Sequence, residues 1–148
     1  MLLLFGGGLS LAAAFESSGL AGWIGGAAAG LAVLPPVFLV GGIAAIVVLL
    51  SELASNTAIA ALFLPIAASV AEGLGRDPLE LAVPAALAAS CGFMLPVATP
   101  PNAIAYGTRT VTVGQMARAG LLLDLVFVLL VTAASFLLVP LVFPPPAG

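Results

Sequence analysis

Long apolar runs alternate with short polar or proline-rich breaks along this chain. Residues 37–50 and 58–70 carry no charged or amide side chain, and the polar sequence SELASNT of residues 51–57 lies between them. Two helical arms of about 17 residues, at 1.5 Å of rise per residue, would each be about 26 Å long. That length is slightly short for a hydrocarbon core of about 30 Å. The pattern predicts a helical hairpin over about residues 36–74 with a polar tip.

A second break follows at the sequence LPVATPPN of residues 95–102, after an apolar run from residue 79. Pro100 and Pro101 have no N–H, so a continuous helix would leave the carbonyls of Pro96 and Val97 unpaired. A residue that precedes proline is also disfavoured in the helical conformation. We therefore expect a helix over residues 79–95, unwinding over about residues 96–101, and a short restart.

The restarted helix is predicted for residues 103–107, with Asn102 as its cap. The whole broken helix therefore covers about residues 79–107. The last helix is predicted for about residues 120–143, after a short polar segment. Asp124 lies near its start and is interpreted as marking the membrane interface, with a proton relay as the alternative.

Composition places the chain in a membrane. Of its 148 residues, 63% are hydrophobic and 6% are charged, whereas a soluble domain has about 25% charged residues. The apolar runs have helix length and lack the alternation of a membrane barrel. The sequence therefore predicts an all-α integral membrane protein. It has no histidine, and its net charge of −3 gives no indication of nucleic-acid binding.

The two breaks together suggest a site. Unpaired carbonyls at membrane depth are tolerated only where they are buried in protein or line a watery cavity, and a sodium ion is a natural partner for them. Ser55, Asn56 and Thr57 stand at the start of the second arm, where free N–H groups favour an anion. Broken helices that hold a cation and an anion in this way are typical of secondary transporters. The alternative is an aqueous turn followed by an ordinary proline kink.

Three further residues have a functional and a structural interpretation. Glu52 is a functional candidate if the tip lies inside the membrane, and otherwise a carboxylate that accepts hydrogen bonds from nearby helix-end N–H groups. Trp23, in a short helix over residues 20–34, is interpreted as an interface anchor. Cys91 is interpreted as a buried packing thiol.

The motifs SNT (residues 55–57), ASCGFMLPVATPPNAI (residues 89–104) and LLLFGGGL (residues 2–9) resemble those of the divalent anion/sodium symporter family, the dicarboxylate and citrate transporters. Members of that family contain two inverted repeats, each with a re-entrant hairpin and a broken transmembrane helix. The resemblance implies that this chain is the C-terminal repeat, and that an N-terminal repeat with the other half of the site is missing.

Residue roles follow from the resemblance by position. Two side chains and two backbone carbonyls are implied to hold one sodium ion, from Ser51, Asn56, Ala54 and Ala98. Five residues are implied to bind a substrate carboxylate, and Asn56 is shared with the sodium site. They are Ser55, Asn56, Thr57, Thr99 and Pro100. The absence of arginine near these motifs agrees with carboxylate binding by amides, hydroxyls and helix ends.

The function implied is secondary transport, without chemistry on the substrate, of a dicarboxylate of the succinate, malate, fumarate or citrate type, coupled to sodium. The expected location is the inner (plasma) membrane, as a multi-pass protein that forms a homodimer when complete. The alternative is a non-transporting assembly fragment that pairs with membrane partners. An intramembrane hydrolase lacks a nucleophile–base constellation in this sequence.

Overall fold

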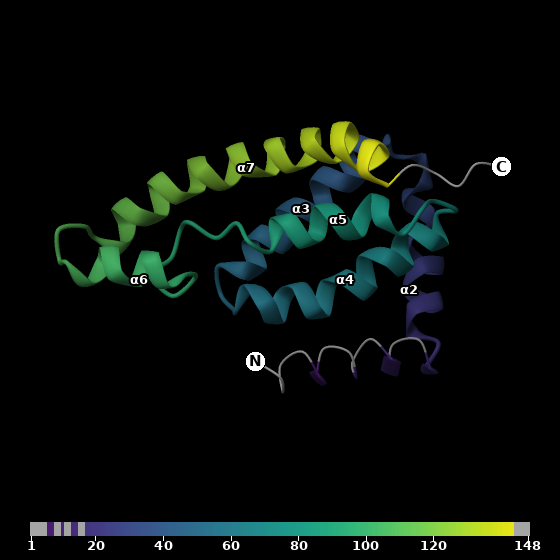
Figure 1. The fold of residues 1–148 in the computed structure, drawn as a ribbon, viewed down its shortest axis with the longest axis horizontal. Helices are drawn as coiled ribbons and strands as arrows, with labels where there is room; N and C mark the ends of the chain where they lie inside the picture. The colour runs from purple at the N-terminus through teal and green to yellow at the C-terminus, as the bar shows by residue number, and fades with distance from the viewer. Residues whose placement is uncertain (1–5, 8–9, 11–12, 15–16, 144–148) are drawn as a thin grey trace.

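The computed structural model describes residues 6–7, 10, 13–14 and 17–143. The regular elements from residue 20 onward are all helical (Figure 1). They are α2 (Leu20–Ala28), the 3-10 helix η1 (Ala29–Val33), α3 (Pro36–Ser51), α4 (Asn56–Gly73), α5 (Leu79–Ala88), α6 (Pro100–Gly107) and α7 (Val113–Val142). Most of the motif over residues 2–9 lies outside the described residues.

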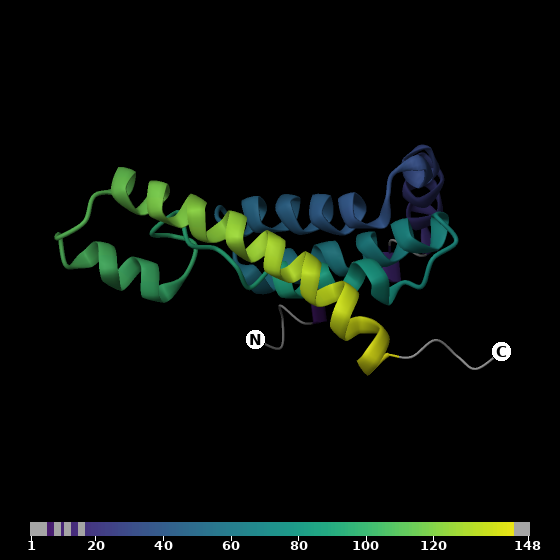
Figure 2. The same cartoon turned by 90° about the horizontal axis from the view of Figure 1, so that it is seen from above.

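Helices α3, α4 and α5 lie side by side, and α7 packs against α3 and α5 (Figures 1 and 2). Helix α2 stands across one end of this group and packs against α4. The fully buried side chains belong mostly to α3 and α5, with Val47, Val48 and Leu81 the largest aliphatic ones. Many large apolar side chains of α7 remain exposed, as expected for a surface that faces lipid. The all-helical prediction is confirmed for the described part of the chain.

The helical hairpin predicted around residues 51–57 is present as the pair α3 and α4. Pro36 occupies the first turn of α3, where its missing N–H costs nothing and its fixed φ suits a helix. By length and composition, α4 and α7 can each cross a membrane, whereas α3 and α5 are shorter apolar helices of 16 and 10 residues. That the hairpin re-enters the membrane stays a prediction.

The broken helix differs from its predicted boundaries. Helix α5 ends at Ala88, although a helix up to residue 95 was expected, and residues 90–99 form no helix. Helix α6 begins at Pro100, and its cap is Thr99, whose side chain accepts a hydrogen bond from the Asn102 N–H. Asn102 is thus not the cap, because Pro100 suits the first helical turn. We call residues 90–99 the unwound segment; its length excludes an ordinary proline kink.

The last helix also begins earlier than predicted. Thr112 and Gln115 form a capping box, in which each side chain bonds the other residue's backbone. The segment expected to be a polar connection is therefore the first part of α7. Asp124 consequently lies well inside a 30-residue helix and is 4% exposed. Its placement near a helix start was wrong.

Glycines allow the closest helix contacts. A Cβ on Gly73 of α4 would lie 2.5 Å from backbone atoms of Gly25 in α2, and a Cβ on Gly120 of α7 would lie 2.4 Å from the Phe93 carbonyl oxygen. No side chain fits at such distances. Small residues at these positions let backbones approach, as is common among membrane helices. The contact at Gly120 presses α7 directly onto the unwound segment.

Candidate functional site

The hairpin tip and the unwound segment meet at one end of the helix group (Figure 1). Glu52, directly after α3, is 3% exposed. Its Oε1 accepts the N–H of Met94, and its Oε2 accepts the N–H of Leu95, each at 2.8 Å. Hydrogen bonds to an ionised group are short and strong. One carboxylate therefore satisfies two backbone donors that the unwinding of the helix leaves without helical partners.

Ser51 adds a second connection between the same two segments. Its hydroxyl lies 2.7 Å from the Val48 carbonyl oxygen, one turn earlier, and 3.0 Å from the carbonyl oxygen of Cys91. A Cβ on Gly92 would lie 3.4 Å from both the Ser51 Oγ and the Ala98 Cβ. Two of the predicted sodium residues, Ser51 and Ala98, thus flank one small glycine, and both are buried.

Asn102, in the first turn of α6, holds the unwound segment through two side-chain hydrogen bonds. Its side-chain Nδ2 donates to the carbonyl oxygens of Gly92 at 3.2 Å and Leu95 at 3.0 Å. The Thr99 side chain meanwhile caps α6. Asn102 was predicted to cap the restarted helix, and its hydrogen bonds to the unwound segment were not predicted. An asparagine that follows two prolines, two residues into a helix, is the local signal for a side chain that is free to turn back.

At the start of α4, the side chain of Asn56 is half-buried, and its Oδ1 is buried without a hydrogen-bond partner among the described residues. An amide oxygen in this state is uncommon, because buried polar atoms are nearly always paired. It is also a good ligand for a cation. Ser55 is the N-cap of α4 by position, but its side chain makes no capping hydrogen bond. The first N–H groups of α4 therefore remain without a side-chain cap.

The predicted site residues differ in how deeply they lie. Ser51 and Ala98 are buried, whereas Asn56, Thr57 and Thr99 are half-buried. Ala54, Ser55 and Pro100 are exposed. Among the described backbone hydrogen bonds of turns and caps, none ends on the carbonyl of Ala54 or Ala98. Both carbonyls are thus available to a cation, as the sodium prediction requires, although the grouping of all four ligands around one ion stays a prediction.

Glu52 has the structural role that was one of its two interpretations, with the difference that its donors belong to the unwound segment and not to a helix end. A cleft of about 330 Å³ lies beside it, lined by Leu49, Leu50, Glu52, Leu53, Met94 and Leu95. Its lining is apolar apart from the acid, and none of the predicted substrate residues lies in it.

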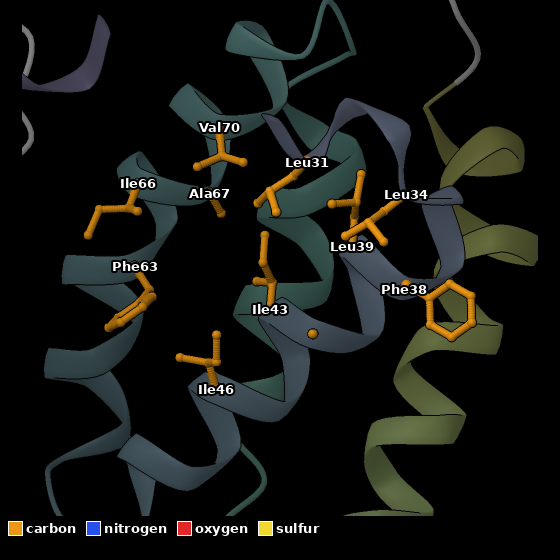
Figure 3. A pocket seen from close by; sticks show the side chains of 11 residues that line it. Leu31, Leu34, Phe38, Leu39, Ile43, Ile46, Phe63, Ile66, Ala67 and Val70 are labelled. Atoms are coloured by element: carbon orange, nitrogen blue, oxygen red, sulfur yellow. The ribbon is translucent and has the colours of Figure 1, made fainter. Parts of the chain in front are cut away.

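A separate groove of about 320 Å³ runs between α3 and α4, away from this site. Figure 3 shows Ile43 and Ile46 of α3 on one side of it and Phe63 and Ile66 of α4 on the other. Every side chain that lines the groove is a hydrocarbon. A carboxylate placed there would lose its hydration without a polar partner, so the groove is unsuited to an anionic substrate.

These features define a class of helical membrane protein in which a hairpin tip and an unwound helix share one polar site. Residues 1–143 match the family described as the sodium:sulfate symporter transmembrane region. The chain belongs to this family, which comprises transporters and not enzymes, as predicted.

Curated relatives support this family assignment. The sodium-dependent dicarboxylate transporter SdcS of Staphylococcus saprophyticus is 42% identical over 140 residues, which are 95% of this chain and 27% of the relative. The protein of the same name from Staphylococcus aureus strain MRSA252 is 42% identical over 142 residues, which are 96% of this chain and 27% of the relative. The chain thus spans about a quarter of the length of these relatives.

Proposed function

We propose that this chain forms half of the transport site of a sodium-coupled dicarboxylate transporter, as the C-terminal of two inverted repeats. The observation that carries the proposal is the buried Asn56 Oδ1, which has no hydrogen-bond partner among the described residues. It belongs to the hairpin tip, whose Ser51 and Glu52 contact the unwound segment. The function named for the relatives, sodium-dependent dicarboxylate transport, supports the choice of both ligands. The transport itself involves no chemistry on the substrate.

In this proposal the sodium ion is held by the Ser51 hydroxyl, the Asn56 Oδ1 and the carbonyls of Ala54 and Ala98. Asn56 can serve both ligands, because its oxygen coordinates a cation while its NH₂ donates to a carboxylate. The substrate carboxylate meets Asn56, Ser55 and Thr57 at the N-terminus of α4, whose free N–H groups favour an anion. Thr99 and Pro100 flank it from the start of α6.

We also propose a membrane topology and an assembly for the complete protein. The hairpin is re-entrant, the complete protein is multi-pass in the inner membrane, and the complete transporter is a homodimer. An N-terminal repeat supplies the second hairpin tip, because one set of helix ends and one sodium ion leave the two charges of a dicarboxylate only partly offset. Inverted repeats also place the moving interface between the two halves.

The test is uptake of radiolabelled succinate into proteoliposomes, with and without a sodium gradient. We expect no sodium-dependent uptake by the 148-residue chain alone, and measurable uptake when it is co-expressed with a matching N-terminal repeat. Absence of uptake in both preparations, with both proteins inserted, would support the assembly-fragment alternative. Uptake by the chain alone would refute the half-site argument and imply that two copies assemble antiparallel.

The re-entrant hairpin has its own test, in a Cys91→Ala background. A cysteine in place of Ala58, near the tip, should react with a membrane-impermeant thiol reagent only through the substrate cavity, and succinate should protect it. Gly42→Cys, where an added Cβ meets nothing within 4 Å, serves as the control outside the site. Free labelling of the tip from the opposite bulk phase, unaffected by succinate, would show that each arm crosses the membrane.

A further inference from the structure

The connection between α6 and α7 forms a cleft that no part of the proposed transport site uses. It lies at the end of the molecule opposite α2 (Figures 1 and 2). Its volume is about 620 Å³, and the residues that line it are Tyr106, Gly107, Arg109, Val111, Thr112 and Val113. Arg109 is the one charged residue of this lining. A cleft with a cation and no acid suits an anionic group.

Arg109 has a backbone conformation that arginine seldom adopts. It is the second residue after α6, with φ +61°, and among the described residues it is the only one other than glycine with a positive φ. This left-handed conformation brings the Cβ of an L-residue close to a backbone oxygen, so glycine or asparagine usually follows a helix that ends in this way. Local strain of this kind is frequent at functional sites. The strained arginine therefore indicates a use for its side chain.

The charges of the described residues are divided between the two ends of the molecule. Neither Arg109 nor Arg118, an exposed residue in the second turn of α7, has an ion-pair partner there, since the one pair joins residues 76 and 80 in the turn between α4 and α5. The acids that reach the surface all lie close to that turn, namely Glu72, Asp77 and Glu80. The end of the molecule that carries the cleft is therefore positive, and the opposite end is predominantly negative.

The length of α7 gives the depth of the cleft in a membrane. Its 30 residues, at 1.5 Å of rise per residue, span about 45 Å. A bilayer has a hydrocarbon core of about 30 Å and measures about 40–45 Å with its headgroups. The cleft directly precedes α7 and therefore lies at the depth of the lipid phosphates. Cytoplasmic loops carry an excess of arginine and lysine, and the cytoplasmic leaflet contains the anionic lipids.

We propose that this cleft binds the phosphate group of an anionic phospholipid, of the phosphatidylglycerol type, through the Arg109 guanidinium. The planar guanidinium matches the geometry of phosphate oxygens, and the aromatic ring of Tyr106 suits the interfacial region. A zwitterionic lipid would bring its ammonium group close to an end of the molecule that is already positive. The binding does not depend on the proposed dicarboxylate transport.

Tryptophan fluorescence of the chain in lipid vesicles tests the site. In a Trp23→Phe background, Tyr106→Trp places the reporter in the cleft. Phosphatidylcholine vesicles then receive equal fractions of phosphatidylglycerol or phosphatidylcholine whose acyl chains are brominated near the glycerol, so that a bound lipid quenches the reporter. We expect phosphatidylglycerol to associate about fivefold more strongly, as expected for one basic residue at a membrane surface. Equal association of the two lipids would overturn the proposal.

A reporter at the other end of α7 is the matched control. Phe143 lines a cleft of about 200 Å³ that also contains Asp77 and Glu80. Phe143→Trp, in the same background, should therefore show no preference for phosphatidylglycerol. A preference as large as that of the Tyr106→Trp reporter would contradict a site that depends on Arg109.

Two arginine variants separate a binding site from general attraction to a charged surface. With the Tyr106→Trp reporter, Arg109→Gln should remove the preference for phosphatidylglycerol. Arg118→Gln removes the same charge from an exposed helical position at the same end and should retain most of the preference. Equal losses in the two variants would show that surface charge alone attracts the lipid, and the proposed site would be wrong.

A competition experiment distinguishes a lipid phosphate from a soluble anion. Inorganic phosphate or succinate is added to the vesicles, with sodium chloride at the same ionic strength as the reference, because salt screens exposed charges. Neither anion should lower the preference for phosphatidylglycerol below its value in chloride. If either does so, the cleft takes a soluble anion and the assignment to a lipid is wrong.

Discussion

Two turns of this molecule join neighbouring helices and use acidic residues in opposite ways. The turn between α4 and α5 satisfies itself: Gly75 takes the left-handed conformation at φ +69°, the Asp77 side chain accepts from the Leu79 N–H, and Arg76 pairs with Glu80. The turn between α3 and α4 sends its acid, Glu52, to backbone donors 42 and 43 residues away. The first turn closes a connection, whereas the second builds a site.

The difference shows which polar groups carry function in an apolar chain. At the turn between α4 and α5, which we call the far turn, side chains are partly exposed and water can replace any of their partners. At the hairpin tip, Ser51 and Glu52 are buried, so their partners must come from the protein. Among the described residues, two buried oxygen-bearing groups lack hydrogen-bond partners, namely the Asn56 amide oxygen at the tip and the Asp124 carboxyl in α7. Unsatisfied buried oxygens next to irregular backbone indicate a place for a cation or a proton.

The largest expected effect comes from removing the acid of the hairpin tip. Glu52→Ala leaves the N–H groups of Met94 and Leu95 without a partner in a buried place. Two hydrogen bonds to a charged group contribute about 3–5 kcal/mol, so we expect a loss of this order in the free energy of unfolding, measured by circular dichroism in detergent. Glu52→Gln keeps one acceptor oxygen and should lose less. If Glu52→Ala were as stable as the parent, the acid of the hairpin tip would contribute no more to stability than the acids of the far turn.

Gly120→Ala tests the contact that presses α7 onto the unwound segment. Its Cβ would lie 2.4 Å from the Phe93 carbonyl oxygen and the Met94 Cα, and overpacking of this kind costs about 1–3 kcal/mol. Gly114→Ala is the matched control in the same helix, where nothing lies within 4 Å and alanine is the better helix former. The two variants should change the unfolding midpoint in opposite directions. If both stabilise the chain, α7 does not hold the unwound segment.

Asn56→Asp tests the tip as a binding site in the complete transporter. The aspartate keeps an oxygen for sodium, loses the NH₂ donor and adds a charge that repels the substrate. Loss of one hydrogen bond to a charged group amounts to about tenfold or more in succinate affinity, while some sodium binding persists. Succinate and sodium titrations of uptake measure the two separately. Unchanged succinate uptake would remove Asn56 from the substrate site.

The sequence predicted the hairpin well because its signals are local. A proline at residue 36, two uninterrupted apolar arms and a cluster of polar residues suffice to place α3 and α4. The start of α7 was also readable, because Thr112 and Gln115 have the spacing of a capping box. The polar side chains of Gln115 and Arg118 instead favoured a polar connection before residue 120, so Asp124 was placed too close to a helix end.

The extent of the unwound segment was not readable in the same way. Prolines at positions 96, 100 and 101 indicate a break, but α5 ends well before them, at Ala88. What stabilises the earlier unwinding is non-local: the Glu52 carboxylate and the Ser51 hydroxyl replace helical partners across about 40 residues of sequence. Periodicity along the sequence reports local structure, so it does not reveal contacts between residues that are far apart in the chain.

The smallest effect is expected at the far turn, and it sharpens the comparison most. Arg76 and Glu80 form an ion pair one helical turn apart, with 30% and 42% of their side-chain surfaces exposed. Solvent screens such a pair, and helical pairs of this spacing contribute only about 0.3–0.5 kcal/mol. Glu80→Ala should therefore lower the free energy of unfolding by no more than this, in the same assay that is used for Glu52→Ala. Added salt should reduce even this difference, because screening weakens exposed pairs. A loss as large as that of Glu52→Ala would mean that the far turn also depends on a buried acid, and the distinction between a closing turn and a site-building turn would fail.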